Sequence, residues 1–275
     1  IKTIKSILEN TCRDYEIIIV DDGSTDDTEE VIENLLNKKI KNYKISNSER
    51  GAARNFGAFK SKGKFLNFFD SDDLSYSKHI KVAKDMIINQ KKIKAFHLSY
   101  EIIDQDKNLI KKVISEGETN IKILRGNIIS CNSMFIERKV FLENLFLENR
   151  DLSGSEDWEL WLRISKKYKI INSKNITTAM INHKERSMIK QNIIRIRKRI
   201  NIFLKYIKEV NKIGLSNKEK KIVISQLLSY KSLHESIVKN EKIQSIKNLF
   251  LSLLLDPTSI ITKRTFVIVK NLLIF

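Results

Sequence analysis

Three aspartates stand close together directly after an apolar run of the chain. Asp70, Asp72 and Asp73 follow Lys64–Phe69 (KFLNFF). Carboxylates two residues apart on a turn can approach one divalent cation from the same side, and such oxygen ligands suit Mg²⁺ or Mn²⁺, which keep open positions for substrate phosphates. Pairs of aspartates are also common on solvated turns. The position of this cluster after large apolar residues favours the metal-binding interpretation.

A second acidic turn, Asp21-Asp22-Gly23-Ser24, follows Tyr15–Val20 (YEIIIV). A carboxylate here could accept hydrogen bonds from a nucleobase N–H or from ribose hydroxyls, and a glycine allows close approach of the backbone. The same residues could instead cap the helix that follows. Both interpretations can hold together.

Strands and helices alternate through the first half of the chain, which is the pattern that would bring the two acidic turns together. Short apolar runs such as Tyr15–Val20 and Lys64–Phe69 are typical of strands buried on both faces. Alternation with helices predicts a parallel, doubly wound sheet, in which ligands bind at the carboxyl ends of strands. Further elements are expected at Thr28–Lys38 (helix), Asn42–Ser46 (strand), Ala52–Ser61 (helix) and Tyr76–Gln90 (helix).

The remainder of the chain changes character twice. Strand patterns are expected within residues 94–113, at Ser130–Ile136 and at Ile170–Ile181, with a helix at Asp157–Lys167. From Met188 onward the pattern is helical, with helices expected at Ile189–Val210 and at Lys218–Leu255, the latter broken at Asp256-Pro257. The longest apolar stretch, Leu249–Leu255, is far short of the roughly 20 residues that cross a bilayer. We therefore predict a catalytic domain over residues 1–187 and a basic helical region over residues 188–275.

Four ordered segments resemble the family 2 glycosyltransferases of the GT-A fold, and the likeness covers roughly residues 1–187. The resemblance implies a Rossmann-like mixed α/β sheet flanked by helices. It also implies an inverting, metal-dependent transfer of sugar from a nucleoside diphosphate sugar, with a UDP-sugar favoured, to a hydroxyl of a glycan or lipid-linked acceptor in bacterial surface polysaccharide synthesis. The segments are YEIIIVDDGSTDDT (15–28), GAARNFGAFKSKGKFLNFFDSDD (51–73), NIISCNSMFIERKVF (127–141) and SEDWELWLR (155–163).

The resemblance assigns roles in donor and metal binding to five of these residues. Asp22 would contact the base or ribose, and Arg54 the base or diphosphate. Asp70 would face the ribose and the metal. Asp72 would be the main ligand of Mn²⁺ or Mg²⁺, with Asp73 as the alternative if the register shifts by one residue.

Two more residues complete the implied site. Asp157 would be the general base, because the adjacent carboxylate of Glu156 and the aromatic bulk of Trp158 and Trp161 would tend to raise its basicity. The tryptophans fit an ordinary helix core, although one of them could line an acceptor site. His183 lies where some family members place a histidine near the metal or diphosphate, and it could equally be a surface histidine at a strand end.

One departure from the family concerns the first strand. Members begin with an apolar strand and a Pro-x-Tyr-Asn-like turn, and neither precedes the helix expected at Ile1–Asn10. Without that strand, two neighbouring strands would expose unpaired backbone N–H and C=O groups, which is costly wherever water is excluded. We expect the strand to exist in the full-length protein.

The charge of the chain is concentrated at one end. The formal net charge is +18, and residues 184–275 hold 20 basic and 6 acidic side chains, a net of +14. Basic residues interleaved with aliphatic ones, as in Arg195–Arg199 and its surroundings, favour a membrane-surface helix attracted to anionic headgroups. The alternative is helices that pack on the catalytic domain with solvated lysines. Nucleic acid is not an expected partner, because few aromatic residues are available for base stacking.

The location and the competing functions follow from the remaining features. Two cysteines, Cys12 and Cys131, cannot form a disulfide framework, and a reducing compartment is expected. We predict a cytoplasmic protein, peripheral on the inner face of the cell membrane. The alternative function is a nucleotide-sugar-binding protein or a nucleotidyltransferase that transfers no sugar. The sugar, the acceptor and the oligomeric state are not specified by the sequence.

Overall fold

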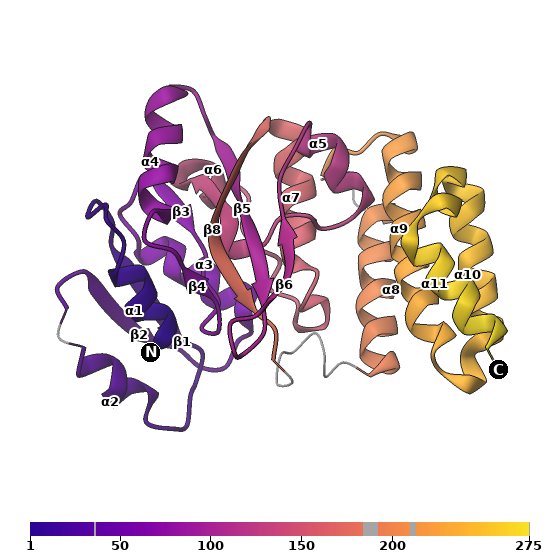
Figure 1. Ribbon diagram of the computed structural model, residues 1–275, viewed down its shortest axis with the longest axis horizontal. Helices are drawn as coiled ribbons and strands as arrows, with labels where there is room; N and C mark the ends of the chain where they lie inside the picture. Colours follow the sequence, from indigo (N-terminus) through magenta and orange to yellow (C-terminus); the bar gives the residue numbers. More distant parts are fainter. Residues whose placement is uncertain (36, 184–191, 210–212, 275) are drawn as a thin grey trace.

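The computed structural model describes residues 1–35, 37–183, 192–209 and 213–274. Within them, the strands form two sheets (Figure 1). β1 (Ile17–Asp21) pairs in parallel with β2 (Ile40–Lys44). The second sheet has the strand order β3 (Phe65–Asn67), β7 (Met134–Glu137), β5 (Ala95–Ile103), β8 (Ile170–Ile181) and β4 (Leu74–Ser75), with β6 (Leu109–Val113) paired to β5.

The larger sheet is mixed, as the family resemblance implied, whereas the alternation of strands and helices alone predicted a parallel, doubly wound sheet. β5 and β8 run parallel, whereas β7 is antiparallel to both β3 and β5, and β4 is antiparallel to β8. The alternation of strand and helix holds only as far as β3. Beyond it, β5 turns back through the β6 hairpin, and the chain enters β7 from the opposite direction.

A cavity of about 1850 Å³ separates β1 from β3, and both strands line it. Among the described residues, β1 pairs only with β2 and β3 only with β7. The edge of each strand that faces the cavity therefore has no strand partner there. This gap is where the expected additional strand would lie, and that strand stays a prediction.

Helices cover the sheets on both sides (Figure 1). The main core lies beneath α7 (Glu156–Lys167), whose Trp158, Leu160, Trp161 and Ile164 are all buried. The expected core stripe is thus confirmed for both tryptophans. The other helices of this part are α1 (Lys2–Leu8), α2 (Thr28–Glu33), α3 (Arg50–Lys60), α4 (His79–Asn89), α5 (Thr119–Lys122) and α6 (Arg138–Leu142), with short 3₁₀ turns η1 (Ile123–Arg125), η2 (Cys131–Ser133) and η3 (Arg150–Leu152).

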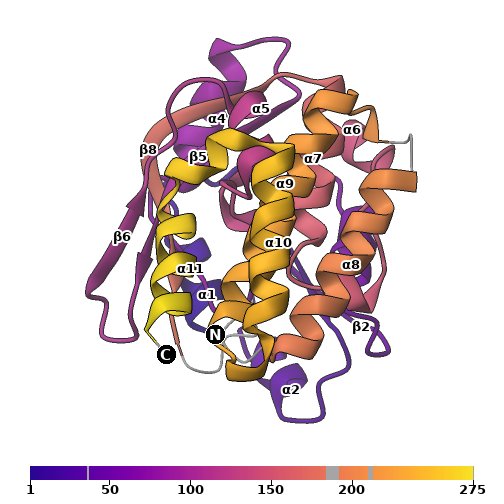
Figure 2. The ribbon, with the colours of Figure 1, turned by 90° about the vertical axis from the view of Figure 1, so that its right-hand side faces the viewer.

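Within residues 192–209 and 213–274, the C-terminal end consists of the helices α8 (Ile193–Glu209), α9 (Asn217–Ser236), α10 (Lys242–Leu255) and α11 (Lys263–Leu273). α8 buries Ile196, Ile200 and Phe203 in the same core as α7. The ends of the expected helix at Ile189–Val210 lie outside the described residues. Helices α9, α10 and α11 lie beyond α8, on the side of the molecule away from the sheet (Figures 1 and 2). No helix within the described ranges is both long and apolar enough to cross a membrane.

The single helical stretch expected at Lys218–Leu255 is wrong, because the chain turns at η5 (Lys239–Glu241). Ser225 contacts Ser252, and Ser232 contacts Ser245, so α10 runs back antiparallel along α9. The seven-residue spacing of these serines places them on one stripe of each helix. Their small side chains let the two backbones approach closely.

Candidate active site

The predicted site residues meet at one cavity. Its wall includes the ends of β1 and β3, the start of α7 and the end of β8. Six of the seven residues assigned a role by the resemblance line it: Asp22, Arg54, Asp70, Asp72, Asp157 and His183. The two acidic turns therefore open into the same space, as the sequence predicted.

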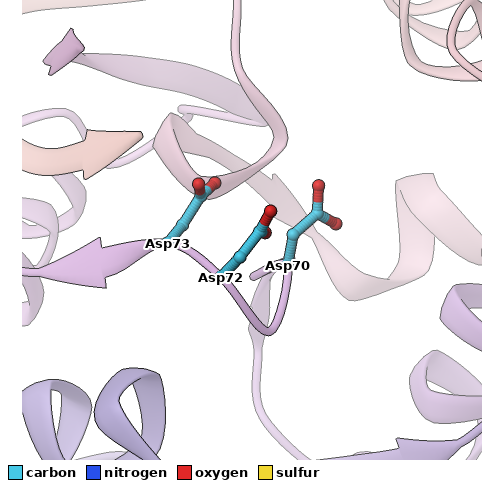
Figure 3. Close-up of side chains that lie close together, drawn as sticks. All are labelled: Asp70, Asp72 and Asp73. Atoms are coloured by element: carbon cyan, nitrogen blue, oxygen red, sulfur yellow. The ribbon is translucent and has the colours of Figure 1, made fainter. Parts of the chain in front are cut away.

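The turn after β3 brings three carboxylates together (Figure 3). One oxygen from each of Asp70, Asp72 and Asp73 lies within 4.8 Å of the others, and all three side chains point to the same side of the turn. Oxygen donors that converge in this way fit the preference of Mg²⁺ and Mn²⁺. The donor set therefore fits a divalent cation.

The three aspartates differ in their surroundings. Asp70 and Asp72 are partly exposed to the cavity, whereas Asp73 is only 2% exposed. The Asp73 Oδ2 accepts a hydrogen bond from Asn132 Nδ2 at 2.8 Å. Asp73 thus has a protein partner that fixes it beneath the turn, which leaves Asp70 and Asp72 as the accessible carboxylates.

His183 reaches this turn from a distant strand. Its Nε2 lies 2.9 Å from Asp72 Oδ2. The cause is the register of the antiparallel pair β4–β8, in which Leu74 faces Ala179, so that residues just before Leu74 lie near those that follow Ile181. The interpretation of His183 as a residue of the metal side is supported by this contact. The contact places an imidazole nitrogen beside the carboxylate oxygens of the turn.

Arg54 connects two acidic segments across the site. From α3, its guanidinium donates to Asp70 Oδ1 at 2.6 Å and to Glu156 Oε1 at 3.0 Å. It also lies over the ring of Phe146, 5.3 Å from the centroid. The side chain of Glu156 is buried, so this ion pair is shielded from water. Arg54 therefore sets the position of the β3 turn relative to the start of α7.

In the turn after β1, the carboxylate of Asp22 accepts hydrogen bonds from backbone N–H groups. Asp22 accepts hydrogen bonds from Ser48 N at 2.6 Å and from Glu49 N at 2.9 Å. Glu49 has a φ of 83°, which is unusual for a residue with a side chain. Asp22 thus holds the strained residue from which α3 begins. Each carboxylate oxygen keeps a second lone pair, so a base or ribose could still be bound there.

The neighbouring Asp21 carries an open acceptor. Its Oδ1 accepts from Ser24 N at 2.8 Å. Its Oδ2 is buried at the cavity and has no hydrogen-bond partner among the described residues. A buried carboxylate oxygen without a donor is costly, so a donor group that enters the cavity would be stabilised here.

Asp157 lies in the first turn of α7, at the cavity wall. Its Oδ2 accepts from Asn127 Nδ2 at 2.7 Å, and its Oδ1 accepts from Trp158 N at 2.7 Å. Removal from solvent, and then the adjacent charge of Glu156, raise the pKa of Asp157 to about 6. A carboxylate of that pKa is ionised at neutral pH and is a stronger base than an ordinary aspartate.

Some contacts of the site were not anticipated from the sequence. Asn127 and Asn132 position Asp157 and Asp73, and both belong to the segment 127–141 that carried the family likeness. Polar residues within that apolar segment were the available signal. Both tryptophans are buried and neither lines this cavity, and Trp158 donates from Nε1 to Ile123 O.

Comparisons with known proteins agree with this geometry. A family model described as "Glycosyl transferase family 2" matches residues 1–146, which is more than half of the chain. An uncharacterized glycosyltransferase of Rickettsia bellii is 32% identical over 171 residues, covering 61% of this chain and 24% of that protein. The chain thus spans about a quarter of the length of that relative. WfaP of Escherichia coli, a UDP-Glc:alpha-D-GlcNAc-diphosphoundecaprenol beta-1,3-glucosyltransferase, is 32% identical over 180 residues, covering 64% and 69%.

Solved structures share the fold at low identity. TarS of S. aureus in complex with UDP-GlcNAc has a TM-score of 0.60 at 14% identity, covering 93% of this chain and 86% of that one. The mannosyltransferase PcManGT of Pyrobaculum calidifontis, in complex with GDP-Man and Mn²⁺, has a TM-score of 0.58 at 14% identity, covering 98% and 82%. Because the family model matches more than half of the chain, the chain belongs to glycosyl transferase family 2.

Proposed function

We propose that this chain transfers a sugar from a nucleoside diphosphate sugar to a hydroxyl of a glycan or lipid-linked acceptor in bacterial surface polysaccharide synthesis. The observation that carries the proposal is the convergence of Asp70, Asp72, His183 and Asp157 on one cavity. A UDP-sugar is the favoured donor, because the Escherichia coli relative is named for UDP-Glc and a diphosphoundecaprenol acceptor.

Asp157 would act as the general base. An acceptor hydroxyl is a poor nucleophile near neutral pH, and a carboxylate that takes its proton assists attack on the anomeric carbon. The raised pKa of Asp157 suits this role, and Asn127 orients the carboxylate. Attack from the side opposite the leaving group would invert the anomeric configuration.

Asp70, Asp72 and His183 would hold the divalent cation. When bound, Mn²⁺ or Mg²⁺ supplies electrostatic stabilisation of the charge that develops on the departing diphosphate. The protein contributes the placement of these ligands, since Arg54 holds Asp70 and the β4–β8 register delivers His183. At the other end of the cavity, Asp21 and Asp22 would accept hydrogen bonds from the nucleoside.

The test compares two aspartates near the start of α7. Asp157→Asn removes the base while keeping the shape of the side chain, and it should lower the transfer rate by about 10²–10⁴-fold. Asp151→Asn is the matched control, because Asp151 pairs with Lys198 at 2.9 Å outside the cavity wall. The control should retain its rate within about twofold.

Donor binding is measured on the same proteins by thermal shift with a panel of nucleoside diphosphate sugars, with and without Mn²⁺. Asp157→Asn should bind the donor as the parent does and fail to transfer it. Normal transfer by Asp157→Asn would show that another group is the base. Donor binding without transfer by the parent chain, across a panel of acceptors, would favour the nucleotide-sugar-binding alternative.

A further inference from the structure

The helix α10 has its polar and apolar faces inverted. The side chains that face the protein include Ser245, Asn248 and Ser252, all at most 4% exposed. Its opposite face is apolar and 54–73% exposed. A surface helix of a water-soluble protein normally buries its apolar stripe. The exposed residues, which lie along one side of the helix at spacings of three and four, are Ile243, Ile246, Phe250 and Leu254.

The inverted orientation is fixed by hydrogen bonds to α9. The hydroxyls of Ser225 and Ser252 lie 2.9 Å apart, and each contacts the backbone carbonyl of the other. Ser232 and Ser245 repeat this arrangement seven residues away along each helix. Turning α10 to bury its apolar side would break these bonds and leave buried hydroxyls without partners. The apolar side must therefore face outward.

Exposed apolar side chains also lie on the neighbouring segments. In η6 (Pro257–Ile261), Ser259 is buried and Ile261 is 78% exposed. In α11, Thr265 is buried and Phe266 is 67% exposed. Figure 2 shows α10 and α11 side by side at the end of the molecule that faces the viewer. We call the exposed set Ile243, Ile246, Phe250, Leu254, Ile261 and Phe266 the outer apolar face.

The charges around the outer apolar face have one sign. From residue 242 to residue 274 the chain has five basic side chains and one acidic one, Asp256. Asp256 is buried and ion-paired with Arg125 at 2.6 Å. Lys247, Lys263 and Lys270 are exposed. Two copies of this face would bring like charges together, so the charge favours an anionic partner over a second copy of the chain.

In the basic run Arg195–Arg199, from which the sequence predicted membrane contact, Arg197 and Arg199 point into the molecule, while Arg195 and Lys198 are exposed. Arg197 pairs with Glu235 at 2.8 Å and with Glu241. Arg199 is buried, and Lys198 pairs with Asp151. The basic surface next to exposed apolar side chains lies on α10 and α11.

We propose that the outer apolar face docks on a bilayer surface that contains anionic lipids. Exposed Ile, Leu and Phe side chains would enter the boundary between headgroups and acyl chains, and Lys247, Lys263 and Lys270 would contact the headgroup phosphates. The inference goes beyond sugar transfer, since it concerns a surface remote from the acidic turns and requires no catalysis.

The test is flotation of the chain with vesicles of phosphatidylcholine alone or with one quarter phosphatidylglycerol. The parent chain should float with the anionic vesicles. The variant Ile246→Ser/Phe250→Ser/Leu254→Ser should bind them at least about tenfold less, because it removes apolar area from the bilayer contact. The matched control is Leu109→Ser/Ile110→Ser/Ile121→Ser, three residues that are 52–59% exposed on β6 and α5. The control should float as the parent does.

A second variant separates the charge from the apolar contact. Lys247→Gln/Lys263→Gln/Lys270→Gln should weaken binding to anionic vesicles by about a hundredfold and remove the preference over neutral ones. Equal flotation of the parent and the Ile246/Phe250/Leu254 variant would overturn the proposal. So would a parent chain that does not float but forms oligomers in sedimentation, with the same variant monomeric. Donor-induced thermal shifts in solution should be unchanged in both variants, so a failure here is distinct from a failure of the proposed function.

Discussion

The turns after β1 and β3 both place adjacent aspartates at the end of a strand, and their carboxylates have different kinds of partner. Asp22 accepts hydrogen bonds from two backbone N–H groups, Ser48 N and Glu49 N. Asp70 and Asp72 contact the side chains of Arg54 and His183. Two turns that look alike in the sequence therefore have different uses.

The difference lies in what a partner can do when a ligand arrives. A backbone N–H is fixed by the fold, so Asp22 stabilises the strained start of α3. A side-chain partner can rotate, so Asp72 and His183 can turn toward a shared cation, while the largely buried Arg54 keeps Asp70 in place. The two turns are linked, because the helix that follows Glu49 carries Arg54 to the β3 turn. The β1 turn fixes the start of α3 and keeps lone pairs for a nucleoside, and the β3 turn supplies the accessible carboxylates.

The largest effect is expected at the β3 turn. Asp72→Ala should lower the transfer rate by roughly a thousandfold, about 4 kcal/mol of transition-state stabilisation, because an accessible cation ligand is lost. The Mn²⁺-dependent thermal shift should disappear with it. The free energy of unfolding without metal should change by less than about 0.5 kcal/mol, since Asp72 is partly exposed.

Asp106→Ala, in the exposed β5–β6 hairpin, is the control for removing a carboxylate. A persistent Mn²⁺ shift in Asp72→Ala would assign the cation elsewhere.

The next effect concerns the connection between the turns. Arg54→Met should destabilise the fold by about 3 kcal/mol, because it leaves the buried carboxylate of Glu156 without its closest cation. The measurement is urea unfolding monitored by circular dichroism.

A double variant checks this cause. Arg54→Met/Glu156→Gln should recover most of the lost stability, since it removes the buried charge as well. A double variant as unstable as the single one would indicate that packing of Arg54 on Phe146, and not charge, is what matters.

The sequence predicted the positions of the site residues better than their partners. Apolar runs located β1 near Tyr15–Val20 and gave β8 at Ile170–Ile181, because a buried strand needs a continuous apolar segment. The contacts Asn127–Asp157 and Asn132–Asp73 join residues 30 and 59 positions apart. No local spacing encodes such pairs, and only the assembled fold shows them.

The C-terminal helices show a second limit of sequence patterns. The periodicity in residues 242–255 reveals an apolar stripe, and a stripe is normally assigned to the core. The stripe of Ser245 and Ser252 on the other side has the same period, and it is the side that packs on α9. Periodicity gives the faces of a helix without saying which one is buried.

A smaller effect is expected at the β1 turn. Asp22→Asn should lower the free energy of unfolding by about 2 kcal/mol. The amide has one acceptor oxygen in place of two and carries no charge, so the hydrogen bonds from Ser48 N and Glu49 N are weakened or lost. Asp27→Asn is the matched control, since Asp27 is exposed and makes no capping hydrogen bond. Thermal unfolding of the three proteins gives the comparison. If Asp22→Asn proved as stable as the control, the structural role of the β1 turn would be wrong.

The smallest effect is expected in the pH dependence of transfer, which depends on Asp157. This carboxylate accepts one hydrogen bond from a backbone N–H, that of Trp158, and one from a side chain, that of Asn127. Its pKa is raised to about 6, mainly by burial and then by the charge of Glu156. A base must be ionised, so kcat/KM should be level above pH 6 and fall about tenfold per unit below it. The measurement is the pH profile of transfer.

Asn127→Ala tests whether the side-chain partner tunes this carboxylate. The hydrogen bond from Asn127 stabilises the ionised form and lowers the pKa, so its removal should move the midpoint of the profile above 6. At pH 8 the variant should transfer at nearly the parent rate, because Asp157 is ionised there in both proteins. A merely structural role for Asn127 would lower the rate at every pH and leave the midpoint in place. A midpoint that moves would show that a side-chain partner sets the pKa of Asp157. Asp70 and Asp72 also have side-chain partners, whereas Asp22 accepts from backbone N–H groups.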